Sequence, residues 1–428
     1  MSLAKDTEKM EAGQKRPTVA LICRKFWNKS GGTQRSVARL STVITRAGFD
    51  TTIWSVKRGN VSDQSVNLTA CRTNLMLRKQ IRTKNPDIAI VFGSSRSDYK
   101  LAADLSQSGQ KVLFSEESEP LHALKRWGAP IPRSKNVAAA ERLYFISCLA
   151  GIRCLRRDIF QSLPLEVQNR AVVIPNYFDH SLVRSVEQQE PRPFFTFVVV
   201  GSDRPWKNVD SVVQAHCKMV EKGSNSRLNI YGRSLDLKQS TLRMMNPKFQ
   251  RFLGFQADRV ALHRSGDVLV IPSHSEGVST VALEAAGLGI PVLAFQDCRG
   301  VTAVIRDGVN GMLIDSDVSD VQSLFEAMSK LEEDKDFTDG LRGRSLESQP
   351  WLTEVNGETA WKDWLDGVLR ATPNPRAAMT RGQIWRLRCF GSVWALVNFR
   401  SEHHGLRILN RRILIRLTNL RRSGRRQF

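Results

Sequence analysis

The chain has 428 residues, of which 41% are hydrophobic, so it is long and apolar enough for two or three domains with cores of their own. We expect no membrane span, because no stretch reaches the roughly 20 apolar residues that a bilayer requires, and no secretory signal, because residues 1–16 are charged. Seven scattered cysteines without a Cys-x-x-Cys pair predict a reduced, cytoplasmic protein without structural zinc, and the net charge of +22 predicts an anionic partner surface.

The first predicted element is a buried strand at residues 19–23. A polar loop that contains Gly31 and Gly32 follows, and apolar spacing predicts a helix at residues 36–47. A strand that runs into glycines and a helix is typical of nucleotide sites, but the Gly-x-Gly-x-x-Gly pattern of NAD-binding domains is missing. The loop therefore either approaches a phosphate or is only a tight turn.

The next elements continue the alternation of strands and helices. Strands are predicted at residues 51–54, 88–92, 112–114, 142–148 and 171–174. An acidic loop with Glu116 and Glu117 follows the third of these strands, and His122 lies shortly after it. The acids favour either a ligand-binding or a simply solvated loop. Alternating strands and helices predict an α/β fold with a doubly wound parallel sheet.

A second domain is predicted after a polar, proline-bearing linker at residues 180–193. It begins with an apolar strand at 194–200, and the following loop carries Arg204 and Lys207 before a helix at 209–220. Two basic residues at the carboxyl end of a strand, just before a helix N-terminus, suit a pyrophosphate, although basic loop residues are more often only solvated.

Residues 268–295 contain the most informative pattern of the chain. An apolar strand is followed by a loop with Glu276, then by a helix capped by Ser279 or Thr280 that carries Glu284. The backbone N–H groups that open such a helix bind anions, and a carboxylate can accept hydrogen bonds from two adjacent hydroxyls. The block therefore suits a sugar attached to a nucleoside diphosphate.

This block resembles the signature of the family 4 glycosyltransferases, which have the GT-B fold of two Rossmann-like domains. The matching residues are Pro272-Ser273, Glu276-Gly277, Glu284 and Gly289-Ile290-Pro291-Val292. The resemblance implies that Glu276 contacts the donor sugar as the catalytic carboxylate and that Glu284 holds the nucleotide ribose. It also implies donor-binding roles for the following residues: Gly31, Gly32, Arg204, Lys207, Gly277, Val278, Ser279 and Thr280.

The sequence departs from the family at two positions. Many members have a histidine after the strand at 112–114, where this chain has Glu116 and Glu117, with His122 as its nearest histidine. We assign these three residues to the acceptor side. Ser202 replaces an arginine of the diphosphate loop, which Arg204 would replace in function. A catalytically altered GT-B scaffold or a nucleotide-sugar epimerase therefore remains the alternative.

The predicted domains are an acceptor-side domain at 17–185, a nucleotide-sugar domain at 194–350, a helix at 351–370 that crosses back to the first domain, and a tail at 371–428. The tail contains thirteen arginines and one acid, with leucines and isoleucines at helical spacing. This composition is typical of a helix that lies on an anionic membrane surface. A packed helical hairpin is the alternative, and nucleic acid is the less favoured partner.

The resemblance implies a hexosyltransferase that moves a sugar from a UDP- or GDP-linked donor to a glycan or lipid-linked acceptor, with retention of configuration. It implies neither a cofactor nor a required metal. Asp315 and Asp317 form an Asp-x-Asp pattern, but they precede a helix and are expected to cap it or to be solvated. We expect the protein to act at the cytoplasmic membrane surface in cell-envelope polysaccharide synthesis.

Overall fold

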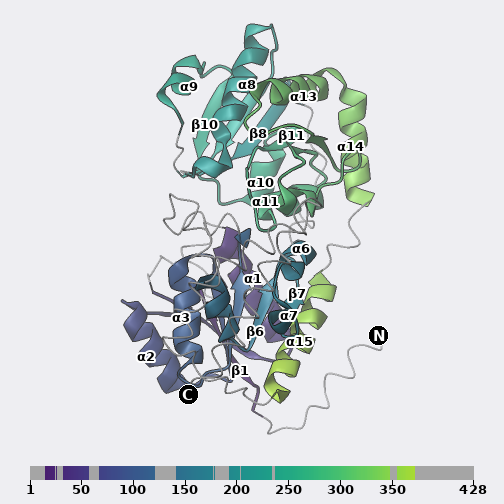
Figure 1. Ribbon diagram of the computed structural model, residues 1–428. Helices are drawn as coiled ribbons and strands as arrows, with labels where there is room; N and C mark the ends of the chain where they lie inside the picture. Colours follow the sequence, from purple (N-terminus) through teal and green to yellow (C-terminus); the bar gives the residue numbers. More distant parts are fainter. Residues whose placement is uncertain are drawn as a thin grey trace, which may run out of the picture.

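A computed structural model describes residues 15–24, 26, 32–56, 67–120, 141–176, 178, 192–202, 204–233, 237–347 and 354–371. The chain forms two parallel β-sheets, each flanked by helices (Figure 1). The first sheet is built from the N-terminal half of the chain and the second sheet from the C-terminal half. This arrangement is the predicted pair of Rossmann-like domains.

The first sheet has the strand order β3-β2-β1-β4-β5-β6-β7, and all its pairings are parallel. Its strands are β1 (Thr18–Ile22), β2 (Asp50–Ser55), β3 (Leu68–Ala70), β4 (Ile88–Gly93), β5 (Val112–Glu116), β6 (Gly151–Cys154) and β7 (Ala171–Val173). The helices with described bounds are α1 (Gly32–Arg46), α2 (Asn74–Lys84), α3 (Arg96–Ser106), α6 (Arg157–Gln161) and α7 (Leu165–Gln168).

The second sheet has the order β10-β9-β8-β11-β12-β13 and is also parallel. Its strands are β8 (Thr196–Val200), β9 (Arg227–Tyr231), β10 (Gln250–Gly254), β11 (Val268–Ile271), β12 (Val292–Phe295) and β13 (Gly311–Ile314). Its helices are α8 (Val209–Glu221), α9 (Gln239–Met244), α10 (Arg259–Arg264), α11 (Thr280–Gly287), α12 (Arg299–Thr302), α13 (Val321–Glu333) and α14 (Lys335–Glu347), with a 3-10 turn at Pro205–Lys207.

The central strands are apolar on both faces because helices cover both sides of each sheet. β4 (IAIVFG) is buried along five of its six residues, and every residue of β11 (VLVI) is buried. Helix starts are set by polar caps: Ser95 and Asp98 form a reciprocal capping box at α3, and Ser279 caps α11. In each sheet the strand order reverses beside the first strand, between β1 and β4 and between β8 and β11. The loops that follow these four strands therefore lie together at the carboxyl edges of the sheets.

The prediction of a strand at 142–148 is wrong, because residues 141–147 are helical and the strand, β6, begins at Gly151. Phe145, Ile146 and Leu149 are buried, and a short apolar run of this kind cannot be distinguished from a buried helix by periodicity alone. The sequence does not predict β6 because its third residue is Arg153, a fully buried arginine in the strand next to the edge of the sheet.

The last described helix, α15 (Glu354–Arg370), follows the second domain but packs on the first (Figure 1). Trp361, Leu365 and Val368 join the core formed by β1, α1 and β4. Lys111 caps the end of the helix, where its Nζ donates to the carbonyls of Val368, Leu369 and Ala371 at 2.8–3.1 Å. Among the described residues, no helix is both long and apolar enough to cross a bilayer.

Candidate active site

A cleft of about 730 Å³ lies between the carboxyl edges of the two sheets. From the first domain it is lined by the start of α1 and by the loops after β4 and β5, and from the second domain by the loops after β8, β9 and β11 and the start of α11. This volume is in the range of small-molecule sites. Both sheets thus present their ligand-binding edges to one space.

Lys207 and Glu276 meet in the second-domain wall of this cleft. Lys207 Nζ lies 2.5 Å from Glu276 Oε1, and both side chains are partly exposed to the cleft. Their loops are joined by the backbone, because the amide of His274 donates to the carbonyl of Trp206 at 2.9 Å. The predicted diphosphate lysine and the predicted catalytic carboxylate therefore form one unit at the carboxyl edge of the sheet.

The N-terminus of α11 lies beside this pair and faces the first domain. A Cβ at Gly32 would lie 3.1 Å from Thr280 Oγ1, and a Cβ at Gly277 would lie 2.9 Å from the carbonyl oxygen of Glu117. These two glycines permit the close approach of the domains. Gly277, Val278 and Thr280 all line the cleft at the helix start, where backbone N–H groups attract anions.

The amide of Ser279 is already bonded within the fold, unlike what the predicted phosphate cradle requires. Its amide donates to the carbonyl of Gly300 at 2.9 Å, and its hydroxyl accepts the capping bond from the amide of Ala282. Both groups are therefore used by the fold, because the loop must be fastened to α12 and the helix must be capped. Ser279 lines the cleft without offering its amide to a ligand.

Glu284 lies on α11 and is almost fully buried. Its Oε2 accepts hydrogen bonds from Arg259 at 2.7 and 2.9 Å and makes a 3.1 Å contact with Nε2 of His263, while Arg35 of the first domain lies 3.6 Å from Oε1. Glu284 lines a small cavity beside Thr280, and Arg259 and Arg35 line the main cleft. In this arrangement basic side chains hold the carboxylate that was predicted to bind ribose.

The protonation states of this cluster follow from burial and charge. Burial opposes ionisation of Glu284, but the His263 hydrogen bond and the charges of Arg259 and Arg35 outweigh it, so its pKa lies well below the usual range. Burial lowers the pKa of His263, and the Glu284 hydrogen bond only partly opposes this shift. A neutral imidazole that donates from Nε2 gives the ionised Glu284 a further hydrogen bond, while Nδ1 of His263 is buried without a partner.

The two acids proposed for the acceptor side have different environments. Glu116 is fully buried beneath the sheet, where Arg142 donates to both its oxygens at 2.7 and 2.5 Å and the hydroxyl of Tyr99 also donates to it. Glu116 is therefore a core residue and not a cleft residue, because successive strand side chains point to opposite faces.

Glu117 does line the cleft, but its Oε1 accepts a 2.6 Å bond from Ser115 and pairs with Arg153 at 3.3 Å. Burial raises its pKa, and Arg153 and Ser115 oppose that shift.

The remaining predicted residues are placed as follows. Arg204 lines the cleft and stacks over Trp206, with its guanidinium carbon 5.3 Å from the ring centre. Gly31, His122 and the tail beyond Ala371 lie outside the described residues. Within the described ranges, no group of three or more His, Cys, Asp or Glu side chains is arranged to hold a metal ion.

Sequence reasoning missed the basic residues that surround the two glutamates. Arg35 comes three residues after Gly32, but nothing in the sequence indicates that it would reach Glu284 across the cleft. Arg259 and His263 lie one turn apart on α10, a spacing that predicts only a shared face. Arg156 was not singled out at all, and it contacts the Glu276 loop from the first domain.

Comparison with proteins of known sequence finds similarity to glycosyl transferases. A family model described as glycosyl transferases group 1 matches residues 184–344. A D-inositol 3-phosphate glycosyltransferase of Thermobifida fusca is 39% identical over 117 residues, which cover 27% of this chain and 24% of the relative. An exopolysaccharide phosphotransferase of Streptomyces coelicolor is 26% identical over 299 residues, which cover 68% of this chain and 29% of the relative. The chain thus spans about a quarter of the length of these curated relatives.

Solved structures agree on the fold. A sucrose-phosphate synthase from Thermosynechococcus elongatus has a TM-score of 0.66 at 14% identity, over 83% of this chain and all of that chain. Anabaena HepE in complex with UDP-glucose has a TM-score of 0.64 at 16% identity, over 82% of this chain and 99% of that chain.

Two facing Rossmann-like domains with an interdomain cleft define the chain as a GT-B protein. Residues 184–344 match the model of the glycosyl transferases of group 1, in agreement with the predicted resemblance to family 4.

Proposed function

We propose that this chain is a glycosyltransferase that moves a sugar from a UDP- or GDP-linked donor to a glycan or lipid-linked acceptor, with retention and without a required metal. The observation that carries the proposal is the Lys207–Glu276 pair beside the start of α11, inside the stretch that matches the family model. UDP is the first nucleotide to test, because Anabaena HepE was solved with UDP-glucose.

In the proposed reaction the bond between the sugar and the diphosphate breaks and a bond from the acceptor hydroxyl oxygen to the same sugar carbon forms. The departing diphosphate carries the developing negative charge and takes up the hydroxyl proton. Lys207, Arg204 and the amides that open α11 all lie on the side of the cleft where this charge would form. Such fixed positive groups stabilise the transition state more than the ground state. Glu276 would hold hydroxyls of the donor sugar and fix its orientation against Lys207.

A thermal-shift panel of UDP, GDP, ADP, NAD and their common sugar conjugates tests the proposal on the full chain. A ligand at a hundredfold excess over its Kd adds about 2.7 kcal/mol of stability. We expect a shift with one nucleotide, and a clearly smaller shift for Lys207→Met, which removes the charge in the cleft. Lys248→Met, on the surface outside the cleft, is the control and keeps the full shift. A shift with NAD alone, or with nothing, contradicts the proposal and favours the altered scaffold.

The proposed setting is the cytoplasmic face of the membrane, in cell-envelope polysaccharide synthesis. Its support is the basic, apolar composition of residues 371–428, together with the 26% identity over 168 residues to a capsular polysaccharide glycosyltransferase of Staphylococcus aureus. Deletion of residues 372–428 should abolish sedimentation with anionic vesicles but leave UDP binding intact. Unchanged sedimentation contradicts the membrane part of the proposal alone.

A further inference from the structure

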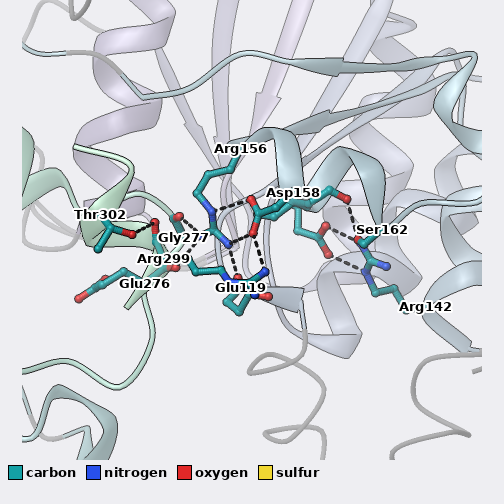
Figure 2. A network of polar contacts seen from close by, with 11 residues as sticks. Glu119, Arg142, Arg156, Asp158, Ser162, Glu276, Gly277, Arg299 and Thr302 are labelled. Carbon is teal, nitrogen blue, oxygen red and sulfur yellow. Dashed lines mark hydrogen bonds and ion pairs between the residues drawn. The ribbon is translucent and has the colours of Figure 1, made fainter. Parts of the chain in front are cut away.

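Arg156 lies in the first domain, between β6 and α6, but its guanidinium reaches the catalytic loop of the second domain (Figure 2). Its Nη1 donates to the backbone carbonyls of Glu276 and Gly277, at 3.1 and 2.5 Å. The side chain is 6% exposed. A buried guanidinium with two adjacent carbonyls of another domain is a strong and directional contact.

The charge of Arg156 is balanced on the first-domain side. Asp158 accepts from Nε and Nη2, both at 2.9 Å, and Glu119 also accepts from Nη2. Asp158 additionally pairs at 3.5 Å with Arg299, which belongs to the second domain. These carboxylates fix the plane of the guanidinium, so that its remaining nitrogen points at the loop (Figure 2).

The loop leaves little freedom for the two carbonyls. A Cβ at Gly300 would lie 2.3 Å from the carbonyl oxygen of Glu276, and a Cβ at Gly277 would contact Glu117 of the first domain. The Glu276–Gly277 backbone is therefore enclosed by α12 on one side and by the first domain on the other. The side chain of Glu276 leaves this backbone toward Lys207.

We propose that Arg156 is a positioning residue which ties the Glu276–Gly277 loop to the first domain, so that Glu276 is held in its working position only while the two domains are closed. Relative movement is the ordinary expectation for two domains joined by linkers. The contact breaks if the domains separate, because donor and acceptors lie on opposite sides of the cleft. This role rests on the proposed function, since it gives Arg156 a part in the same site.

The expected effects separate catalysis from donor binding. Lys207, Arg204 and the start of α11 all belong to the second domain, so Arg156→Ala should leave the Kd for UDP within about threefold of wild type. The release of UDP from UDP-glucose or UDP-N-acetylglucosamine should fall roughly a hundredfold, which is the effect of misplacing a catalytic group by about 1 Å. Arg156→Lys should not restore it, because a single ammonium cannot serve two carbonyls and two carboxylates together.

Arg170→Ala is the matched control. Arg170 also donates to two backbone carbonyls, those of Leu149 and Ser147 at 2.8 and 3.0 Å, but both lie within the first domain. This variant should lose thermal stability without a change in the UDP release rate at permissive temperature.

Hydrogen exchange of a peptide covering residues 275–280, measured on the full chain without ligand, reports the contact independently of activity. We expect faster exchange there in Arg156→Ala and Arg156→Lys, and no change in Arg170→Ala. Unchanged exchange in both Arg156 variants, or equal losses of UDP affinity and turnover, overturns the proposal. If wild type binds neither UDP nor GDP, the proposed function fails, and the exchange result still decides whether Arg156 holds the loop.

Discussion

The two walls of the cleft are built on the same plan but use their charged residues differently. Both sheets contain six parallel strands in the order 3-2-1-4-5-6, and the first sheet adds a seventh at its edge. In the second-domain wall, Lys207 and Glu276 face the open cleft. In the first domain, Glu116 ends β5 and Glu117 follows it at the carboxyl edge of the sheet, but the two acids pair with the buried arginines Arg142 and Arg153.

The difference shows that one strand-end position can serve either a ligand or the core. A carboxylate at the carboxyl edge of a parallel strand is in the right place for a ligand, but a buried arginine within reach neutralises it and removes it from chemistry. In the first domain the arginines come from the helix at 141–147 and from β6. The acids of the two walls should therefore respond in opposite ways to mutation.

The largest effect is expected at Glu116, and it is an effect on folding. Glu116→Ala leaves Arg142 charged, buried and without its carboxylate, which should cost about 3–5 kcal/mol of unfolding free energy. Urea denaturation of the full chain measures this loss. Glu141→Ala, which breaks the partly exposed pair with Arg96, is the control and should cost less than about 1 kcal/mol. Loss of turnover in Glu116→Ala at full stability would mean that Glu116 is a site residue after all.

Glu276→Gln should show the reverse pattern. The amide cannot hold sugar hydroxyls and Lys207 as the carboxylate does, so UDP release from UDP-sugars should fall at least about a hundredfold. Thermal stability should stay close to that of wild type, because the side chain faces the cleft. Glu333→Gln, on the exposed surface of α13, controls for charge. Turnover close to wild type in Glu276→Gln would remove Glu276 from the reaction.

Acid should weaken the second domain more than the first. Among the described residues the histidines are His216, His263 and His274, all in the second domain. Burial, followed by the charge of Arg227, lowers the pKa of His216 to about 4. The unfolded chain binds a proton below its ordinary pKa of about 6.5, while the folded chain does not until about pH 4, so stability falls as the pH drops through this window.

For His216 alone the loss is on the order of 2–3 kcal/mol at pH 4. Hydrogen exchange at pH 7 and pH 4.5 should show greater deprotection in β9 than in β4. His216→Gln should reduce the difference between these strands. Equal deprotection of both would contradict the prediction.

Ser279→Ala should give the smallest loss of stability, and it tests whether Ser279 caps α11 or binds the donor phosphate. Loss of an N-cap costs about 1 kcal/mol, so the melting temperature should fall by a few degrees. The Kd for UDP should not change, because the hydroxyl caps α11 and the amide, which alanine retains, binds Gly300. Calorimetric titration with UDP measures it, with Ser95→Ala at the α3 cap as control. A tenfold weaker Kd for UDP would return Ser279 to the phosphate cradle.

The sequence predicted the second domain better than the first, for physical reasons. The strand, loop and helix around Glu276 are local, and their apolar runs, cap and glycines are readable within 28 residues. Arg35, Arg156 and Arg259 contact the two glutamates over sequence separations that no periodicity encodes. The sequence does not predict β6, because Arg153 interrupts its apolar run. It also does not predict the burial of Glu116, because this burial depends on Arg142, which lies in a helix where the sequence predicts a strand.

The cap that Lys111 provides for α15 has a mechanical consequence. Lys111 immediately precedes β5, so the end of α15 and the exit point of the chain at Ala371 lie at the amino edge of the first sheet, on the side opposite the cleft. Any anchor attached beyond Ala371 would therefore pull on the first domain and transmit no load through the second. The first domain would then be fixed by the anchor, and the second domain would move relative to it when the contacts across the cleft break.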